Sequence, residues 1–305
     1  MAMKTELETN APSDTPPCPV CGVARSAMVY PDTLGSDLPR LDYGFCADHG
    51  RTYEIRRCES CTHLFSVVTA NELWKTYRDL VDPAYLEREQ ERSATFRKVV
   101  DRIHRFVPGG RLLDIGCATG DFLHSAQRYY DVEGVELSRW SSQIAMGRGF
   151  RVHTSRLGDI TGKSVYDVVT LWGVFGLFEQ PNDELDQISR LLTPGGCVCI
   201  WTGDMASVTS RLLGRRYWYV MGQYLQLFTK KSLCELFQRH GFETAWMGTY
   251  PFTSSLRYLG NSLGRYQVVG KAAKALLHRP PLSGLSVTLL LPGEMFAIFR
   301  KVPQS

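Results

Sequence analysis

Residues 111–123 read "RLLDIGCATGDFL". Apolar residues on both sides of Asp114 form a strand, and Gly116 and Gly120 follow it. A glycine-rich turn between a strand and a helix lets a ligand approach the backbone closely, and the helix start adds unpaired N–H groups. These glycines do not match the GxGxxG spacing of dinucleotide folds. An acid in the turn would repel a pyrophosphate, so the turn favours a ligand that carries a positive charge.

Strand-like and helix-like segments alternate from residue 111 onward. This alternation predicts an α/β fold, a Rossmann-like seven-stranded, mostly parallel sheet with helices on both faces. A helix is expected over 231–240, ended by Gly241. The expected strands are 111–115, 131–135, 151–154, 166–171, 196–202, 242–250 and 294–301.

A second acid, Glu136, stands at the end of the next predicted strand, 20 residues after Gly116. An acid in that position can accept hydrogen bonds from both hydroxyls of a ribose. Functional sites on open parallel sheets lie at the carboxyl ends of the strands. The turn and this acid together therefore indicate a nucleoside site.

These motifs resemble those of class I S-adenosylmethionine-dependent methyltransferases. DIGCATG and VELS look like the first two family motifs, and YDVVTLWGVF, LLTPGGCVCIW and FTKKSLCELFQRHGFE fit later ones, so the resemblance covers about 107–302. It implies S-adenosylmethionine as cofactor, with Glu136 on the ribose. The other cofactor-binding residues it implies are Asp114, Gly116, Cys117, Ala118 and Gly120 around the methionine part, Leu137 against the adenine, Asp159 and Ile160 at the adenine edge, and Leu171 and Trp172 in the floor.

The sequence departs from the family pattern after the fourth strand. Relatives of the ubiquinone-methyltransferase type carry a Glu-His pair where this chain has Gly176 and Leu177. A base is needed only when the acceptor must lose a proton, so methyl transfer is not excluded. Asp204, just after the fifth strand, is the first candidate for the base, and His153 reads as an ordinary strand histidine.

Aromatic residues on two segments are candidates for the substrate pocket. Tyr77 and Tyr85 lie in a helical linker that folds over the cofactor in similar enzymes, and they fit a pocket or a helix core equally well. Trp218 and Tyr224 lie in "RRYWYVMGQYLQLF", which could form an acceptor pocket, an interface or plain packing.

Four cysteines in two CxxC pairs, Cys18 with Cys21 and Cys58 with Cys61, predict a structural zinc in a zinc-ribbon-like module. Cys46 with His49 is an alternative to the second pair. His63 reads as an ordinary polar strand residue.

The chain is expected to have four parts. Its N-terminus lacks an apolar signal core, no stretch is long enough to span a membrane, and the unevenly clustered cysteines favour metal over disulfides, so a cytoplasmic protein is expected. The expected parts are a disordered leader over 1–17, the zinc-ribbon-like module over 18–70, a helical linker over 71–106 with Asn71 as N-cap, and a methyltransferase domain over 107–305 with an insertion at 203–230 and a helical segment at 253–280.

The favoured function is methyl transfer to a small-molecule acceptor such as a sugar, polyketide or lipid precursor. A ribosomal-RNA-type methyltransferase that binds RNA through the zinc ribbon and a non-catalytic cofactor-binding module are the alternatives. The net charge of +4, spread along the chain, argues against nucleic acid. The basic, amphipathic helix in "LGRYQVVGKAAKALLHR" allows a peripheral membrane contact, but its short apolar face favours a helix that covers the sheet.

Overall fold

The computed structural model describes residues 15–44, 49–68, 73–263, 267–290 and 292–303. Its main sheet has seven strands in the order β10-β13-β8-β7-β4-β5-β6, which confirms the predicted fold. Only β13 runs antiparallel to its neighbours in this sheet. The strands are β4 (Arg111–Ile115), β5 (Asp131–Val135), β6 (Arg151–His153), β7 (Tyr166–Trp172), β8 (Leu192–Gly203), β10 (Phe242–Gly248) and β13 (Glu294–Lys301).

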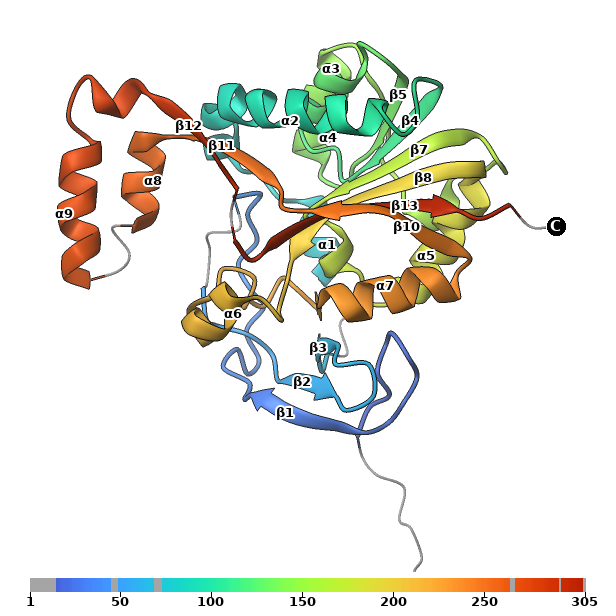
Figure 1. Cartoon of the computed structure of the whole chain (residues 1–305), viewed down its shortest axis with the longest axis horizontal. Helices are drawn as coiled ribbons and strands as arrows, with labels where there is room; N and C mark the ends of the chain where they lie inside the picture. Colours follow the sequence, from blue (N-terminus) through green and yellow to red (C-terminus); the bar gives the residue numbers. More distant parts are fainter. Residues whose placement is uncertain (1–14, 45–48, 69–72, 264–266, 291, 304–305) are drawn as a thin grey trace, which may run out of the picture.

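Helices cover both faces of this sheet (Figure 1). On one face α2 (Glu89–His104) and α3 (Asp121–Ala126) pack on alternate strand residues such as Leu112 and Val168, with α4 (Arg139–Gly147) beside them. On the other face α5 (Pro181–Leu191) and α7 (Lys230–Arg239) pack on the intervening residues. Because side chains alternate along a strand, these two apolar clusters use successive positions of the same strands.

A four-stranded sheet in the order β1-β2-β3-β9 lies against the α7 side of the body (Figure 1). Its first three strands are β1 (Ser26–Tyr30), β2 (Ile55–Cys58) and β3 (Leu64–Ser66). The fourth, β9 (Gln226–Leu227), comes from the aromatic insertion far along the chain and pairs antiparallel with β3. The cysteine-rich segment and the insertion therefore form one sheet.

The linker before the main sheet is broken into three helical pieces, α1 (Leu73–Arg78), η1 (Pro83–Arg88) and α2. The break follows from Asp82, whose side chain caps η1, and from Pro83, which can begin a helix but cannot continue one. The predicted cap Asn71 lies outside the described residues, as does most of the predicted leader.

The last part of the chain before β13 forms an arm, defined here as residues 251–290, that stands apart from the sheet (Figure 1). The expected strand over 242–250 ends at Gly248, and the chain continues into this arm. The expectation that the basic helix covers the sheet is wrong, because α9 packs against α8 in the arm. The arm comprises β11 (Pro251–Ser255), α8 (Leu256–Leu263), α9 (Gln267–Leu277), η5 (Leu282–Gly284) and β12 (Ser286–Leu290), and the remaining short helices are η2 (Leu157–Asp159), η3 (Phe175–Leu177), α6 (Val208–Leu213) and η4 (Gly214–Arg216).

Candidate functional site

Asp114 lies on β4, and one of its two carboxylate oxygens makes no hydrogen bond with the described residues. The residue is 1% exposed and lies opposite Thr170 in the β4–β7 pairing. The Thr170 hydroxyl donates a hydrogen bond of 2.6 Å to Asp114 Oδ1, whereas Oδ2 is buried and has no hydrogen-bond partner among the described residues. Burial raises the pKa of Asp114 well above its usual range. A buried acid with a free oxygen is completed by a cationic donor.

The turn after β4 requires a glycine at its first position. Gly116 has φ +73°, and a Cβ there would lie 2.4 Å from Val174 Cγ2. Ala118 and Gly120 also have positive φ, and Gly120 is the N-cap of α3. Cys117 is buried within the turn. The backbone is therefore bent sharply directly after Asp114, with Val174 packed close to Gly116.

Glu136 follows β5 and is tied to the same turn. It is 5% exposed. Its Oε2 accepts from the Ala118 backbone N–H at 2.9 Å, and its Oε1 accepts from the Ser138 N–H at 2.7 Å. Burial raises the pKa of Glu136 and these two N–H groups oppose that shift. The Tyr43 side chain and the Leu137 N–H also favour the charged form of Glu136, so a diol would compete with Tyr43 for this acid.

The remaining predicted cofactor residues differ in their surroundings. Leu137 is half-buried, and Trp172 is buried with an indole Nε1 that has no partner among the described residues. Ile160 and Leu171 pack in the α5–α7 core. Asp159 is exposed, and its Oδ2 accepts from the Arg156 N–H at 3.2 Å.

Three tyrosines from the linker and the N-terminal segment lie over the two acids. Tyr77 and Tyr85 are half-buried, and their pKa values are raised by desolvation and by the neighbouring acids, Glu136 among them. Tyr43, which the sequence analysis did not single out, contacts Tyr85 with ring centroids 5.0 Å apart. The Ser138 hydroxyl donates to the Leu80 carbonyl at 2.8 Å, which fixes the linker on the strand end.

Asp121 connects the linker helix α2 to the glycine turn. It was not among the residues expected from the sequence. It is the first residue of α3 and is 2% exposed. Arg92 Nε donates to its Oδ2 at 2.7 Å, and Arg148 Nη1 donates to its Oδ1 at 2.6 Å. Arg148 also pairs with Glu89 at 2.9 Å. The signal in the sequence was an acid directly after the last glycine of the turn.

A buried acid and several aromatic rings meet at the carboxyl edge beyond β8. Because β13 is antiparallel, its first residue, Glu294, pairs with Gly203 at the end of β8. The indole N–H groups of Trp201 and Trp218 donate to Glu294 at 2.6 and 2.9 Å. Burial raises the pKa of Glu294 to about 7. We call Glu294, Trp201, Trp218 and Tyr250, which stacks on Trp201 at 4.4 Å, the acidic-aromatic cluster.

Asp204, the predicted base, contacts its near neighbour Ala206 and the first residue of α7, Lys230. Its Oδ1 accepts from the Ala206 N–H at 3.0 Å, and its Oδ2 lies 3.9 Å from Lys230 Nζ. It sits one residue beyond the partner of Glu294, so both acids lie at the same edge. Glu294 could have been found as an isolated acid that opens an otherwise apolar strand after Pro-Gly.

The insertion fills the place of the missing Glu-His pair. A Cβ on Gly176 would lie 2.8 Å from both the Gln226 carbonyl oxygen and Tyr224 Cδ1. The Leu225 N–H donates to the Gly176 carbonyl at 2.9 Å. A glycine at this position is therefore required by the close approach of the chain around β9, and Tyr224 is fully buried there.

The four paired cysteines come together as predicted. Their sulfur atoms all lie within 4.8 Å of one another, with Cys18–Cys61 at 3.6 Å and Cys21–Cys58 at 3.5 Å. Thiolates around a tetrahedral zinc lie about 3.8 Å apart, given Zn–S bonds of about 2.3 Å. Cys46 lies outside the described residues, and the cluster does not include His49.

The interpretation of His63 as an ordinary strand residue is wrong. His63 precedes β3, is fully buried, and its Nε2 contacts Gln226 Oε1 at 2.8 Å. Its Nδ1 lies 3.4 Å from the Ser232 hydroxyl on α7. His63 therefore joins the cysteine-bearing sheet to the insertion and to α7.

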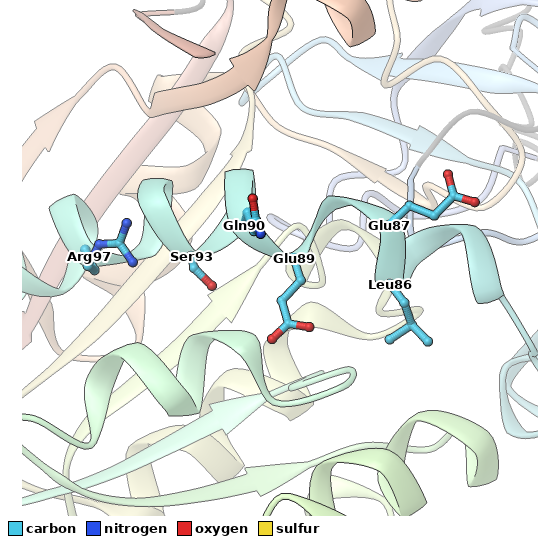
Figure 2. A pocket seen from close by; sticks show the side chains of 6 residues that line it. All are labelled: Leu86, Glu87, Glu89, Gln90, Ser93 and Arg97. Carbon is cyan, nitrogen blue, oxygen red and sulfur yellow. The ribbon is translucent and has the colours of Figure 1, made fainter. Parts of the chain in front are cut away.

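A cavity of about 790 Å³ lies along η1 and the start of α2, outside the glycine turn. Figure 2 shows Leu86 and Glu89 pointing to one side of this helical stretch and Glu87 to the other. None of its lining residues belongs to the glycine turn or the acidic-aromatic cluster. It is lined by Leu86, Glu87, Glu89, Gln90, Ser93 and Arg97.

Comparison with known proteins identifies relatives of this chain. A family model described as a methyltransferase domain matches residues 88–245. An uncharacterized protein of Methanocaldococcus jannaschii is 28% identical over 128 residues, which cover 42% of this chain and only 59% of that protein.

Two solved structures share the fold. One belongs to the complex between the Haloferax volcanii Trm112 methyltransferase activator and a methyltransferase, at TM-score 0.53 and 14% identity, covering 78% of this chain and 100% of that chain. The other is a SAM-dependent methyltransferase of Thermotoga maritima, at TM-score 0.50 and 18% identity, covering 75% and 99%. Among the described helices, none has the length and apolar character needed to cross a bilayer.

Proposed function

Since this chain belongs to the methyltransferase-domain family, we propose that it transfers a methyl group from S-adenosylmethionine to a small-molecule acceptor. The observation that carries this proposal is the buried oxygen of Asp114 that has no partner among the described residues, beside the sharply bent glycine turn, with Glu136 tied to the same turn. An acid in that position suits a cationic ligand.

The residues present fit the cofactor. Asp114 would accept from its ammonium group, the turn from Gly116 to Gly120 would pass along its methionine part, and Glu136 would hold its ribose hydroxyls. Leu137 and Trp172 would flank it, and Asp159 would accept from the adenine amine. S-adenosylmethionine supplies an electrophilic methyl group on a sulfonium. The tyrosines above the two acids, Tyr77 and Tyr85 with Tyr43, would exclude water from the reacting atoms.

We assign the acceptor to the acidic-aromatic cluster. Aromatic faces hold a small apolar acceptor, and the Glu294 carboxylate, which the two indole N–H groups fix in place, can accept from its polar group. The acids Glu294 and Asp204 at this edge would repel a phosphate backbone, which favours a small molecule over RNA. Trp218 belongs to this cluster, whereas Tyr224 packs behind it against Gly176.

Glu294 is our candidate for the proton acceptor in place of Asp204. A base works best when its pKa is near the working pH, and burial raises that of Glu294 to about 7. Its carboxylate would receive the proton that an O–H or N–H acceptor loses. Asp204 is a positioning residue in this proposal, because its Oδ1 accepts from the Ala206 N–H in the turn before α6, whereas the groups that hold Glu294 are the rings of the proposed acceptor site.

We further propose that Cys18, Cys21, Cys58 and Cys61 hold a structural zinc. The hydrogen bond with Cys18 raises the pKa of Cys61, and a bound cation would favour the thiolates. Thr62, directly after the second CxxC pair, has φ +62°. A threonine rarely adopts this conformation unless the surrounding structure enforces it.

The proposed division of the chain is a zinc-ribbon-like module to residue 70, a linker cover to residue 106 and a methyltransferase domain after it. The insertion at 203–230 supplies β9 to the module sheet. We therefore expect the module and the domain to fold as one unit rather than as independent parts.

The test is transfer of labelled methyl groups from S-adenosylmethionine to a panel of small alcohols, phenols and amines, with bulk RNA as a separate acceptor. We expect label on a small molecule and a pH–rate profile that Glu294→Gln abolishes or shifts. Label on RNA alone would favour the RNA alternative. Binding of S-adenosylhomocysteine without transfer to either class would favour a non-catalytic module.

A further inference from the structure

Acidic residues are absent from a long segment near the end of the chain. Residues 244–293 contain no Asp or Glu but five basic residues, all of them within the arm. The remaining 30 basic and 31 acidic residues nearly cancel. The positive charge of the protein is therefore concentrated in the arm, although the basic residues alone look evenly spread along the sequence.

The arm exposes these charges away from the body. It projects beyond the sheet and α2 (Figure 1). The side chains of Arg257, Lys271, Lys274 and Arg279 are exposed. Lys271 and Lys274 are three residues apart on α9, so they lie on one face of the helix.

Large apolar side chains are exposed on the same arm. Leu276 is 54% exposed, Leu285 is 52% exposed, and Leu290 is 67% exposed, with Leu289 beside it at 36%. The arm meets the body through β11 on α2 and through Thr288 of β12 on Lys98, and Leu290 lies beside Lys98 in a surface pocket, yet these side chains keep the exposure given above. Several large exposed leucines on one arm of the structure indicate an interaction surface.

The short helix α6 extends this surface. The Thr209 hydroxyl donates to the Pro292 carbonyl at 2.6 Å, which holds α6 beside the end of the arm. Val208 and Leu212, four residues apart on one face of α6, are 71% and 80% exposed. Together α6 and the arm hold six of the twelve most exposed large apolar side chains among the described residues.

We propose that α6 and the arm dock on the surface of a membrane that contains anionic phospholipids. Basic side chains beside exposed leucines, with no acid among them, suit a surface that offers negative headgroups over an apolar layer. A nucleic acid would use the charges but would leave the leucines in water. The charge pattern therefore favours a lipid surface over RNA.

The two ends of the arm adjoin the acidic-aromatic cluster along the chain. The arm begins directly after Tyr250 and ends shortly before Glu294, so both of its ends lie at the proposed acceptor site. If the proposed function holds, docking would present that site to molecules in the bilayer. This points to an amphiphilic acceptor with an apolar tail.

The test is sedimentation of the full chain with vesicles of phosphatidylcholine alone, or of phosphatidylcholine with phosphatidylserine as the minor component. We expect binding to the mixed vesicles that falls as salt rises, and little binding to phosphatidylcholine alone. Lys271→Glu with Lys274→Glu should weaken binding about tenfold or more. The control, Arg105→Glu with Lys163→Glu, makes the same change in net charge at exposed residues outside the arm and should leave binding unchanged.

A second variant tests the apolar contribution. Leu276→Ser with Leu290→Ser should weaken binding while the salt dependence persists. Equal binding to both vesicle types, equal loss in the control, or arm-dependent binding of a fluorescent single-stranded RNA in place of vesicles would each overturn the proposal. These readouts need no methyl transfer, so a failure here is distinct from a failure of the proposed function.

Discussion

Replacing Glu294 by Gln should change how the stability of the protein depends on pH. Glu294 is fully enclosed and receives hydrogen bonds from the neutral indoles of Trp201 and Trp218. The other titratable groups that face it are the hydroxyls of tyrosines 217, 219, 224 and 250, whose own pKa values Glu294 raises. Burial is therefore the main reason that the pKa of Glu294 rises from 4.5 to about 7.

The sign and size of the effect follow from this rise. The folded protein holds the Glu294 proton more tightly than the unfolded chain does, so the free energy of unfolding falls as pH increases from about 4.5 to about 7. The loss is about 3 kcal/mol, since each pKa unit corresponds to about 1.36 kcal/mol. Glu294→Gln removes this pH dependence. It also changes the free energy of unfolding by an amount that does not depend on pH, because the Gln amide cannot accept hydrogen bonds from both indoles.

The assay is urea unfolding of the parent and of Glu294→Gln at intervals between pH 4.5 and 8.5. Over this range the free energy of unfolding of the parent should fall by about 3 kcal/mol relative to that of the variant. This change is expected whatever the difference between the two proteins at low pH. Glu243→Gln, an exposed position on β10, should track the parent. Parallel curves for the parent and Glu294→Gln would refute the argument that burial raises this pKa.

Three further predictions concern the cofactor turn and the cysteines. Asp114→Asn should weaken S-adenosylhomocysteine binding by about 1–3 kcal/mol in calorimetry, the value of a hydrogen bond to a charged group; unchanged affinity would remove Asp114 from the site. Gly116→Ala should lower stability by about 1–3 kcal/mol and impair that binding, because of its φ of +73° and the nearby Val174; Gly147→Ala, in an open helical position, should be harmless. Cys58→Ser should abolish bound zinc in elemental analysis and lower the melting temperature, and zinc retained in full would exclude the four-cysteine site.

The main sheet could be predicted because its signals are local. The central strands β4, β7 and β8 are mostly apolar runs, and the acids Asp114 and Glu136 mark two neighbouring strand ends. The paired cysteines were equally readable, since two-residue spacing gives each pair its own tight turn. In these cases the pattern within about ten residues was enough.

The rest of the site depends on contacts between distant segments. Glu294 reaches the carboxyl edge only because β13 is antiparallel, which its own sequence does not state. Arg92 and Arg148 meet Asp121 because two helices converge on a third. The expectation that the basic helix covers the sheet was wrong, because α9 packs on α8 and not on the sheet.

The pairing of β3 with β9 has a consequence for how the protein is made. His63 and Gln226, which contact each other across this pair, are separated by 163 positions. A ribosome therefore releases the cysteine-bearing strands long before their last partner strand exists, and contacts of such long range form slowly. Until β9 is made, β3 is an exposed sheet edge. If the nascent chain bound a metal at its four cysteines, the sheet would still lack its fourth strand.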